Sequence, residues 1–293
     1  MHRVTAVVVN WNSGDDLARL LVDLRAQTGV DVSILVVDNG SADTSVKRAL
    51  ETGVAFQLHS AGQNLGYTGG NNLAAELAGP DADLFVVNPD VRLPDPATVA
   101  RLADALATDA TLAAVAPAIE VSPGLAEYLG SEIDLERVRA VHTLTDVAFP
   151  ADVQPRALSR IDGAALLVRA EARREIGFFD DRFFLIWDEV EWCVRATRQG
   201  WRVALYPGVR INHQRSSSFA GSNKSAYYYW RNLYLICRLH ASSRWTWRRR
   251  YVARLARFTG RPAVLRSPRY ALVVLRGAFD GVRGRVGPGP EDI

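Results

Sequence analysis

Short, wholly apolar runs alternate with segments of helical periodicity through the first half of the chain. The runs that predict strands are 4–9, 32–37, 56–58, 84–87 and 112–115. Between them, apolar residues recur at helical spacing and predict helices over 17–24, 44–50, 71–78 and 97–107. Strands that alternate with helices in this way indicate a parallel sheet with helices on both faces.

The pattern changes in the second half of the chain. From about Glu120 to Asp152 neither periodicity holds, which predicts a variable, loop-rich insertion. Beyond it we expect a strand over 161–168, a helix from about 170, a helix over 189–198 and a strand over 201–206. These continue the earlier order, so we predict an α/β fold with a single doubly wound, mostly parallel sheet flanked by helices.

The composition is that of an ordinary soluble protein, with 293 residues of which 48% are hydrophobic and 23% charged. It excludes a disordered chain, a collagen-like fibre and a disulfide scaffold. Cys193 and Cys237 lie in apolar runs, so we expect two buried thiols and, from them, a cytoplasmic location. No apolar stretch is long enough to predict a membrane-spanning helix. We therefore expect a protein that is soluble or peripheral to a membrane.

Charge is distributed unevenly along the chain. The segment from Arg238 to Ile293 contains thirteen arginines and three acidic residues, a net charge of +10, whereas the whole chain carries +3. Trp245, Trp247 and Phe279 lie among these arginines, as in helices that lie in a membrane interface. We predict a basic helical C-terminal extension that contacts a membrane surface; a solvated helical face is the alternative. No motif indicates nucleic-acid binding.

Polar turns follow three of the predicted strands. They are Asn10-Trp11-Asn12, the turn that begins with Asp38 and Asn39, and Asn88-Pro89-Asp90. Ligands of open α/β sheets bind at the carboxyl ends of the strands, where these turns would lie together. The Asp38 carboxylate would accept hydrogen bonds from a base or ribose, or would simply cap its turn.

The segment Asn64-Leu65-Gly66-Tyr67-Thr68-Gly69-Gly70-Asn71-Asn72 precedes a predicted helix. Paired glycines allow backbone N–H groups to approach a ligand closely. The helix N-terminus that follows would favour an anion such as a diphosphate; a flexible loop with an asparagine cap is the alternative. The spaced glycines of dinucleotide-binding proteins and the lysine of a phosphate-binding loop are both missing, which argues against a dehydrogenase and a P-loop ATPase.

Two further groups of residues carry candidate chemistry. Asp188, Glu189 and Glu191 lie at the beginning of a predicted helix, where the helix dipole stabilises acids. Like charges so close together also raise a carboxyl pKa, which suits a general base. Asp90 and His213 together would offer oxygen and nitrogen ligands for Mg²⁺ or Mn²⁺.

In this order, and joined by Asp162-Gly163-Ala164 and Gly177-Phe178-Phe179-Asp180, these segments resemble glycosyltransferase family 2. The resemblance covers about residues 4–240 and is greatest to bacterial rhamnosyltransferases. It implies the GT-A fold over residues 1–237, with a nucleotide-sugar-binding half over about 1–115 and an acceptor and catalytic half over about 116–237. Residues 238–293 would form the basic helical extension.

The resemblance also implies inverting transfer of a sugar to an acceptor hydroxyl. The first candidate donor is dTDP-rhamnose, and the acceptor would be a cell-envelope glycan, a lipid-linked glycan or a small natural product. Glu189 falls on the position of the base, with Asp188 as the other candidate. Acceptor contacts would come from Trp187, Asp162 and Gly163, and the divalent metal would be held by Asp90 and His213. The implied donor contacts are Asn10, Trp11, Asn12, Asp38, Asn39, Asn64, Gly69, Gly70, Asn71, Asn88 and Asp90.

Two departures from the family pattern leave alternatives open. Asn88 replaces a common acid, and Asp188-Glu189-Val190-Glu191 stands where such enzymes commonly have Glu-Asp-Val-Asp. A different donor, such as UDP-galactofuranose or UDP-N-acetylglucosamine, and a non-catalytic sugar-nucleotide-binding protein are therefore alternatives. A nucleotidyltransferase would need a glycine-rich, basic N-terminal loop that residues 10–15 do not provide. The tail at 275–285 resembles tails of enzymes that act at the inner membrane face.

Overall fold

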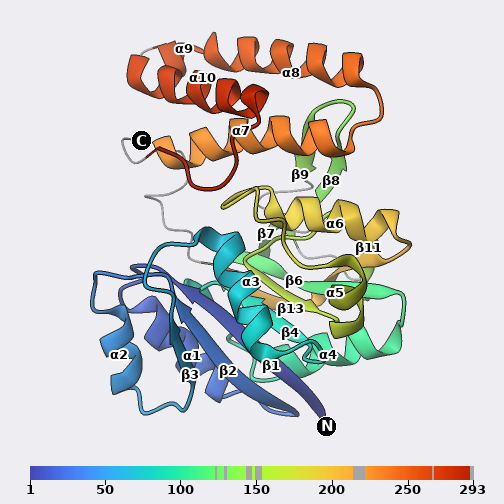
Figure 1. Cartoon of the computed structure of the whole chain (residues 1–293). Coiled ribbons are helices and arrows are strands. Elements are labelled where there is room, and N and C mark those ends of the chain that lie inside the picture. Colours follow the sequence, from blue (N-terminus) through green and yellow to red (C-terminus); the bar gives the residue numbers. More distant parts are fainter. Residues whose placement is uncertain are drawn as a thin grey trace.

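An 11-stranded mixed sheet runs through the body of the molecule, beneath a separate layer of helices (Figure 1). This computed structural model describes residues 1–122, 124–128, 131–142, 147–148, 154–213, 222–265 and 267–290. Four parallel strands form one half of the sheet, in the order β3-β2-β1-β4. They are β1 (His2–Asn10), β2 (Val30–Asp38), β3 (Gln57–Ser60) and β4 (Leu84–Val87).

One antiparallel strand interrupts the parallel order at the centre of the sheet. β12 (Ala165–Val168) pairs antiparallel with both β4 and β6 (Leu112–Ser122). β13 (Arg202–His213) runs parallel to β6, and the short β5 (Val91–Arg92) and β11 (Arg156–Leu158) pair antiparallel with β13. The α/β fold with a central sheet flanked by helices is thus confirmed, but the sheet is mixed, because β12 and the short strands beside β6 and β13 pair antiparallel. β12 is shorter than predicted, and β13 extends to His213.

Helices cover both faces of the sheet. One face packs against α1 (Asp16–Arg25), α2 (Ser45–Glu51) and α4 (Thr98–Thr108). The other face packs against α3 (Gly66–Ala78), α5 (Ala170–Ile176) and α6 (Asp188–Arg198).

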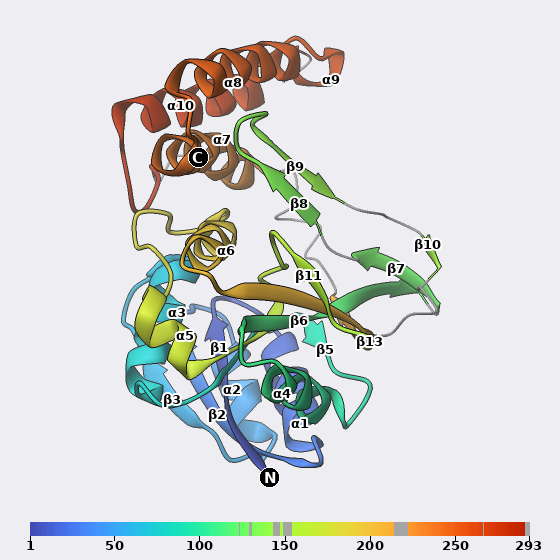
Figure 2. The same cartoon turned by 90° about the vertical axis from the view of Figure 1, so that its right-hand side faces the viewer.

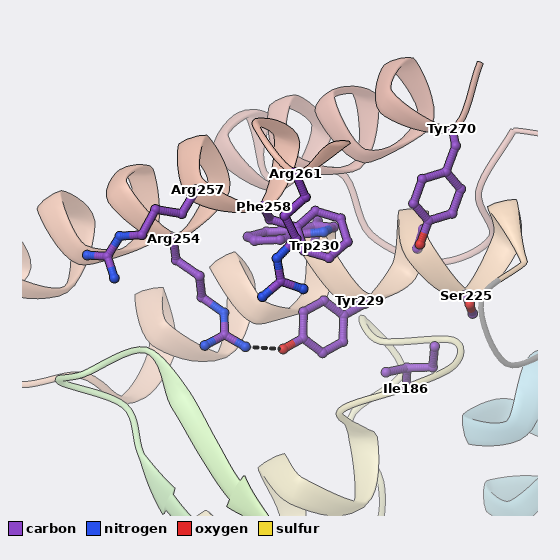
Figure 3. Close-up of a pocket in the computed structure, with 10 residues that line it drawn as sticks. Ile186, Ser225, Tyr229, Trp230, Arg254, Arg257, Phe258, Arg261 and Tyr270 are labelled. Carbon is purple, nitrogen blue, oxygen red and sulfur yellow. Dashed lines mark hydrogen bonds between the residues drawn. The ribbon is translucent and has the colours of Figure 1, made fainter. Parts of the chain in front are cut away.

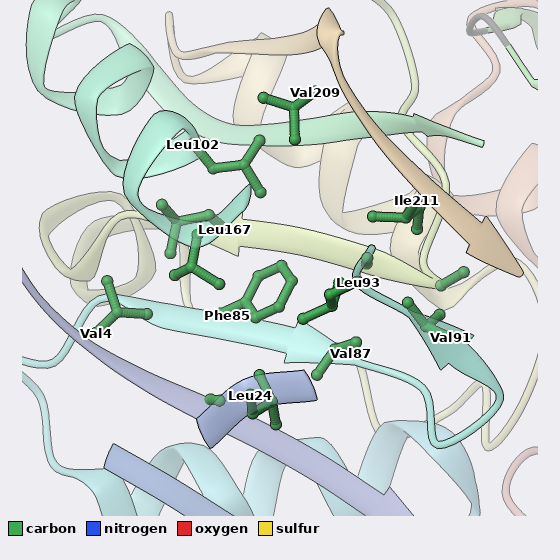
Figure 4. Close-up of a cluster of buried hydrophobic side chains, with 14 of the residues drawn as sticks. Val4, Leu24, Phe85, Val87, Val91, Leu93, Leu102, Leu167, Val209 and Ile211 are labelled. Atoms are coloured by element: carbon green, nitrogen blue, oxygen red, sulfur yellow. The ribbon is translucent and has the colours of Figure 1, made fainter. Parts of the chain in front are cut away.

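The continuous apolar runs are explained by this double cover. Val8 and Phe85 contribute to the cluster on the α1 and α4 face, which Figure 4 shows, whereas Val7 and Val86 contribute to the cluster on the α3 and α6 face. Successive side chains of a strand point to opposite faces, so a strand covered on both faces has no polar position in its middle.

The prediction of a loop-rich insertion between about 120 and 152 was wrong for the described residues. They contain β7 (Leu125–Tyr128), β8 (Ser131–Asp134), β9 (Arg139–His142) and β10 (Val147–Ala148). β8 and β9 form a hairpin that extends from the sheet toward the helical layer (Figure 2). These strands have four residues or fewer, too few for an alternating pattern to be recognised. Their stability comes from contacts such as that of Val138, which is buried in the core of the helical layer.

The helical layer consists of α7 (Asn223–His240), α8 (Arg244–Thr259), α9 (Pro262–Leu265) and α10 (Pro268–Arg283). The expected helical character of the basic C-terminal segment is therefore confirmed. α7 and α10 are joined by a buried hydrogen bond of 2.8 Å from the Tyr227 hydroxyl to Asp280 Oδ2. α7 crosses residue 237, so the division of the chain there stays a prediction.

Two simpler expectations can be compared with the structure. Cys193 and Cys237 are both free thiols and both buried, as predicted. Across the described ranges, none of the helices combines the length and the hydropathy that crossing a bilayer requires.

Candidate active site

The turns after β1 and β2 are tied together by Asn10. Its side chain is fully buried, and its amide nitrogen donates to Asp38 Oδ1 at 2.8 Å, to Ser45 Oγ at 2.9 Å and to Ser41 Oγ at 3.0 Å. Asp38 is also buried, and its second carboxylate oxygen accepts from the Ser41 backbone N–H at 3.2 Å. The hydrogen-bonding capacity of the Asn10 amide group is therefore used within the protein, and Asn10 shapes the turns rather than facing a ligand.

The adjoining side chains of the first turn are more accessible. Asn12 has a φ of 51° and accepts a hydrogen bond from the Ala42 N–H at 2.8 Å, which joins the two turns. The Trp11 ring is 47% exposed, and the ammonium nitrogen of Lys224 lies 5.6 Å from its centroid. Lys224 belongs to the beginning of α7, so the helical layer extends to the carboxyl end of β1. An aromatic surface and a cation are adjacent there.

The glycine-rich segment forms helix, not the loop that we predicted. α3 begins at Gly66, so Gly69 and Gly70 lie inside it and the helix N-terminus comes earlier than expected. A Cβ at Gly70 would stand 2.6 Å from the Val9 side chain, so this glycine permits close packing of α3 on β1. Gly66 has a φ of +74°, and a Cβ there would meet the Phe184 carbonyl oxygen at 2.3 Å. Gly66 and Gly70 are therefore required by contacts with distant residues, which cannot be deduced from the neighbouring sequence.

Three asparagines predicted as donor contacts lie around the beginning of α3. Asn64 is exposed, and its side-chain oxygen accepts from the Gly66 N–H at 2.8 Å. Asn39 is buried and donates to the Gly66 carbonyl at 2.8 Å, while the buried Asn71 donates to the Tyr67 carbonyl at 2.9 Å. Asn39 thus holds the beginning of α3 against the end of β2, whereas Asn64 and Asn71 bond only to the first residues of α3.

Asp188 and Glu189 begin α6, and they differ in accessibility. Asp188 is 2% exposed and accepts a hydrogen bond of 2.7 Å from the Thr68 hydroxyl of α3. The Glu189 side chain is 13% exposed, and its Oε1 lies 3.1 Å from Nη2 of Arg160. Of the two candidates for a base, Glu189 is thus the one that a ligand can reach, whereas Asp188 is held by α3.

The pKa values of both carboxyl groups are raised, because the surroundings disfavour their charged forms. Burial is the main cause in each case, and it raises the pKa of Glu189 to about 8. The guanidinium of Arg160 acts in the opposite direction on Glu189, while the negative charges of Asp188 and Asp162 add to the effect of burial. Burial, followed by the same three carboxylates, also raises the pKa of Tyr67. A carboxyl group with so high a pKa is a stronger base than an ordinary carboxylate once it is ionised, which requires a pH of about 8 or more.

The 162–164 segment lies directly against Glu189. A Cβ built on Gly163 would meet Glu189 Cγ and the Tyr67 hydroxyl at 3.3 Å each. The Tyr67 hydroxyl donates to the Gly163 carbonyl at 2.6 Å, and Asp162 Oδ1 accepts from the Ala164 N–H at 2.9 Å. The Asn88 N–H donates to the Ala164 carbonyl at 2.8 Å. This segment therefore connects the turn after β4 to the beginning of α6.

Two residues of the acidic segment have different surroundings from those expected. Trp187 is 4% exposed and packs on Tyr229 with ring centroids 5.5 Å apart, so its ring is not free to make the acceptor contact that the resemblance implied. Its apolar ring is buried in the core between α6 and α7. Glu191 is 1% exposed and pairs with Arg195 at 2.9 Å and His240 at 3.0 Å. Glu191 therefore links α6 to α7.

Asp90 and His213 are brought together from distant parts of the chain. Asp90 Oδ1 lies 3.2 Å from His213 Nε2, because His213 is opposite Val91 where β13 pairs with β5. A carboxylate and an imidazole both suit Mn²⁺ and Mg²⁺, so these residues fit a divalent metal as part of its coordination shell. Within the described ranges, no group of three or more His, Cys, Asp or Glu side chains gathers for a metal. The remaining ligands would have to come from elsewhere.

The loop before α6 is strained and firmly held. Phe184, Ile186 and Trp187 have φ angles of 65°, 66° and 74°, unusual values for residues with large side chains. From α7, the buried Asn232 amide lies within hydrogen-bond distance of the Phe183, Leu185 and Ile186 carbonyls, at 3.0, 2.8 and 2.8 Å. The buried Arg231 guanidinium donates to the Phe183 carbonyl at 2.7 Å. The helical layer therefore determines how Asp188 and Glu189 are presented.

Several residues around the carboxylates were not predicted. They are Tyr67, Thr68, Arg160, Arg231 and Asn232. Tyr67 and Thr68 lie in the glycine-rich segment, but no feature of that segment pointed to a partner more than 90 residues away. The Arg231-Asn232 pair interrupts an apolar, aromatic run of α7, and this is the one signal that a closer look at the sequence would have found.

Comparison with known proteins gives three kinds of match. Residues 5–149 match a family model described as Glycosyl transferase family 2. The chain is 27% identical over 234 residues to N-acetylglucosaminyl-diphospho-decaprenol L-rhamnosyltransferase of Mycobacterium tuberculosis, with 72% of this chain and 76% of the relative covered. It is 33% identical over 205 residues to Galactofuranosyltransferase GlfT1 of the same species, with 67% of this chain and 65% of that relative covered.

Among solved structures, the chain is similar to the mannosyltransferase PcManGT from Pyrobaculum calidifontis in complex with GDP-Man and Mn²⁺. The TM-score is 0.59 at 15% identity, with 96% of this chain and 87% of that chain covered. At this identity the likeness concerns the fold.

Proposed function

Because this chain belongs to glycosyl transferase family 2 and is a glycosyltransferase with the GT-A fold, we propose that it transfers a sugar from a nucleotide diphosphate to an acceptor hydroxyl, with inversion at the anomeric carbon. The observation that carries this proposal is the juxtaposition of Glu189, a largely buried carboxylate of raised pKa whose side chain is still 13% exposed, with the 162–164 segment. The 162–164 segment also contacts the turn after β4, through the hydrogen bond from the Asn88 N–H to the Ala164 carbonyl.

The nucleoside of the donor would lie at the ends of β1 and β2. Trp11 offers an aromatic face to a base, and Lys224 beside it offers a cation to the phosphates. Asp38 and Asn10 would act by keeping the turns in place, since their polar atoms already bond to each other. Asn12, Asn39, Asn64 and Asn71 would support the same surface from the turns and from the beginning of α3.

The diphosphate would lie between the turn after β4 and the end of β13. Asp90 and His213 would hold a divalent metal there, with Asn88 as a neutral neighbour and phosphate oxygens of the donor as further ligands. When bound, such a metal supplies positive charge to the departing diphosphate. The Mn²⁺ of the complex with PcManGT is consistent with this assignment.

The proton transfer is assigned to Glu189. Its carboxylate would accept the proton of the acceptor hydroxyl, whose oxygen forms a bond to the anomeric carbon on the face opposite the diphosphate. The bond from that carbon to the diphosphate breaks, and the nucleoside diphosphate leaves. Arg160 orients the Glu189 carboxylate, and Asp188, fixed by Thr68, keeps its pKa high enough for it to take up the proton.

We propose rhamnose from dTDP-rhamnose as the donor sugar and a lipid-linked or cell-envelope glycan as the acceptor. The rhamnosyltransferase with 27% identity supports both, since its name specifies an N-acetylglucosaminyl-diphospho-decaprenol acceptor. Galactofuranose is the second candidate, because the galactofuranosyltransferase is 33% identical over a shorter alignment.

We also propose that the protein works at the inner membrane face. The outer face of α10 exposes Leu272, Leu275, Phe279 and Val282, and Arg269, Arg276 and Arg283 alternate with them. Apolar side chains flanked by arginines on one face of a helix favour contact with an anionic lipid surface. This face covers no other part of the described chain, which leaves it available for such contact.

A thermal-shift panel tests the donor assignment. The purified protein is heated with dTDP-rhamnose, UDP-galactofuranose, UDP-N-acetylglucosamine or GDP-mannose, each with Mn²⁺, with Mg²⁺ and with EDTA. We expect the largest rise in Tm with dTDP-rhamnose and a metal ion, and a smaller rise with EDTA. A larger rise in Tm with UDP-galactofuranose would identify that nucleotide, and not dTDP-rhamnose, as the donor. Equal Tm values with every nucleotide would contradict the proposed function.

A further inference from the structure

A cavity of about 460 Å³ lies in the helical layer, outside the carboxylate cluster (Figure 3). It is formed by α7 and α8, with Tyr270 of α10 at one end and Ile186 of the loop before α6 at the other. Its volume is within the range of about 300–1,000 Å³ that is usual for small-molecule sites. Nothing in the proposed donor site or in the proton transfer uses this cavity.

The interior of the cavity is aromatic. Tyr229 and Trp230 line it from α7, and Phe258 lines it from α8. The rings of Trp230 and Phe258 are 5.3 Å apart at their centroids, so they form one continuous apolar surface. Such a surface is complementary to a hydrocarbon group rather than to a sugar nucleotide.

The rim of the cavity is cationic. Arg254, Arg257 and Arg261 follow one another on one face of α8 and its C-terminal end, and all three line the cavity. Figure 3 shows the Arg254 and Arg261 side chains directed toward the aromatic rings and the Arg257 side chain directed outward at the edge. Arg254 is anchored by a hydrogen bond of 2.8 Å to the Tyr229 hydroxyl, and Arg261 lies over the Phe258 ring at 5.3 Å. None of the ten lining residues is acidic, and in the described part of the chain neither Arg257 nor Arg261 has a carboxylate partner. Guanidinium groups placed in this way bind phosphate oxygens in pairs.

The position of the cavity connects it to the reaction. Ile186, one of its lining residues, belongs to the strained loop and precedes Glu189 by three positions. Tyr229 lines the cavity and packs against Trp187 of the same loop. Tyr270, which also lines the cavity, precedes the exposed Leu272 of α10 by two positions. An occupant would therefore extend from the catalytic loop toward the face that we assign to the membrane.

We propose that this cavity binds the diphosphate and the adjoining hydrocarbon of a prenyl-diphosphate-linked acceptor, with the arginines on the phosphates and the aromatic rings on the chain. The identification of this occupant as an acceptor rests on the proposed function, whereas the binding itself does not. The site holds the acceptor by its lipid anchor and so leaves its sugar hydroxyl free to approach Glu189.

The experiment uses farnesyl diphosphate as the probe, with the full-length protein and no sugar nucleotide. Binding is followed by quenching of tryptophan fluorescence, which Trp230 should report, and by calorimetry. We expect farnesyl diphosphate to bind at least about tenfold more tightly than inorganic pyrophosphate or farnesol, since each half of the ligand contributes more than about 1.4 kcal/mol. Equal affinity for pyrophosphate, or for farnesol, would overturn the proposal by showing a simple anion site or a simple apolar site.

Matched charge reversals on α8 locate the site. Arg257→Glu and Arg261→Glu should each weaken farnesyl diphosphate binding by about tenfold or more. Arg248→Glu makes the same charge change on the opposite face of α8 and should leave the affinity unchanged. Equal loss in all three variants, or no loss in any, would contradict a site in this cavity.

Donor binding is measured on the same proteins and separates the two proposals. If sugar nucleotides stabilise the protein but farnesyl diphosphate does not bind, the cavity proposal fails and the proposed function stands. If farnesyl diphosphate binds in the expected order while no sugar nucleotide does, the cavity is a prenyl-diphosphate site in a protein whose proposed reaction is wrong.

Discussion

The side-chain amide of Asn232 donates a 2.8 Å hydrogen bond to the carbonyl oxygen of Ile186, 46 residues earlier in the chain. Ile186 has a φ of 66°, and its neighbour Trp187 has a φ of 74°, so the loop that presents Glu189 adopts a conformation that is costly by itself. The helical layer compensates for this cost through Asn232 and Arg231. We infer that the C-terminal helices are part of the catalytic apparatus, because they hold its loop in position.

Replacing Asn232 by Ala should lower kcat by about tenfold or more, with little change in the donor KM. The loop would relax, and the Glu189 carboxylate would move away from its position beside the acceptor hydroxyl. The Tm should also fall, since buried carbonyl groups would lose their donor at a cost of about 1–3 kcal/mol. Steady-state kinetics and thermal denaturation measure the two effects.

Tyr251→Phe is the control for that substitution. It removes the buried 2.8 Å hydrogen bond from Tyr251 to the Trp230 carbonyl in the same helical layer, but it does not touch the loop. It should lower the Tm and preserve kcat. If Asn232→Ala preserved kcat as well, Asn232 would be a stabilising residue only.

Glu189→Gln should abolish transfer and leave donor binding intact. General-base catalysis contributes about 10²–10⁴-fold, so kcat should fall by that factor while the donor-induced rise in Tm is unchanged. Glu191→Gln is the matched control two residues away, where the carboxylate pairs with Arg195 and His240 instead of facing a ligand. If the Glu189 variant turned over normally, Glu189 would not be the base, and Asp188 would be the remaining candidate.

The reaction should depend on pH through Glu189. Because its pKa is raised to about 8, the carboxyl group is protonated and inactive as a base at lower pH, so kcat/KM for the acceptor should rise with pH and level off above about 8. Arg160 lowers this pKa and Asp188 raises it. Arg160→Gln should therefore move the rise to higher pH and Asp188→Asn to lower pH. If both substitutions shifted the pH profile in the same direction, the charges of Arg160 and Asp188 would not be what sets the pKa of Glu189.

Asp90→Ala and His213→Ala should each remove the metal-dependent part of donor binding, so that the Tm with donor and Mn²⁺ equals the Tm with donor and EDTA. The reason is that the two side chains, 3.2 Å apart, are the protein ligands that we assign to the metal. Asp81→Ala, at an exposed ion pair with Arg174, is the control and should keep the full shift. A metal-dependent shift that survived in both variants would place the metal elsewhere.

The outer face of α10 should bind anionic lipid vesicles in sedimentation assays. Leu272 and Phe279 are 67% and 53% exposed, and the insertion of one such side chain contributes about 1.5–3 kcal/mol. Changing both to Glu should therefore weaken vesicle binding by about tenfold or more. Leu50→Glu, at a leucine of α2 that is 59% exposed, is the control. Equal loss in that variant would indicate that sedimentation reports general surface charge rather than the α10 face.

The sequence by itself determined the order of elements and the places where chemistry would lie. Continuous apolar runs occur only where both faces of a strand are covered, and this is how β1, β2 and β4 are buried. Asp38 and Asp90 stood out because polar residues directly follow these apolar strands, although Asp38 proved to be buried and bonded within the protein. The acids of α6 stood out because charge gathers at its first turn.

Only the tertiary structure decided what each side chain does. Asn10 turns inward to Asp38, Trp187 enters the core against Tyr229, and Gly70 lies inside α3 where a helix meets a strand. Thr68 reaches Asp188 across 120 positions of sequence. Periodicity describes how a residue relates to its neighbours along the chain, whereas burial, pKa and hydrogen-bond partners depend on the packing of distant segments. That is the physical reason why the sequence could indicate which segments carry the polar side chains but could not tell that Glu189 is more exposed than Asp188.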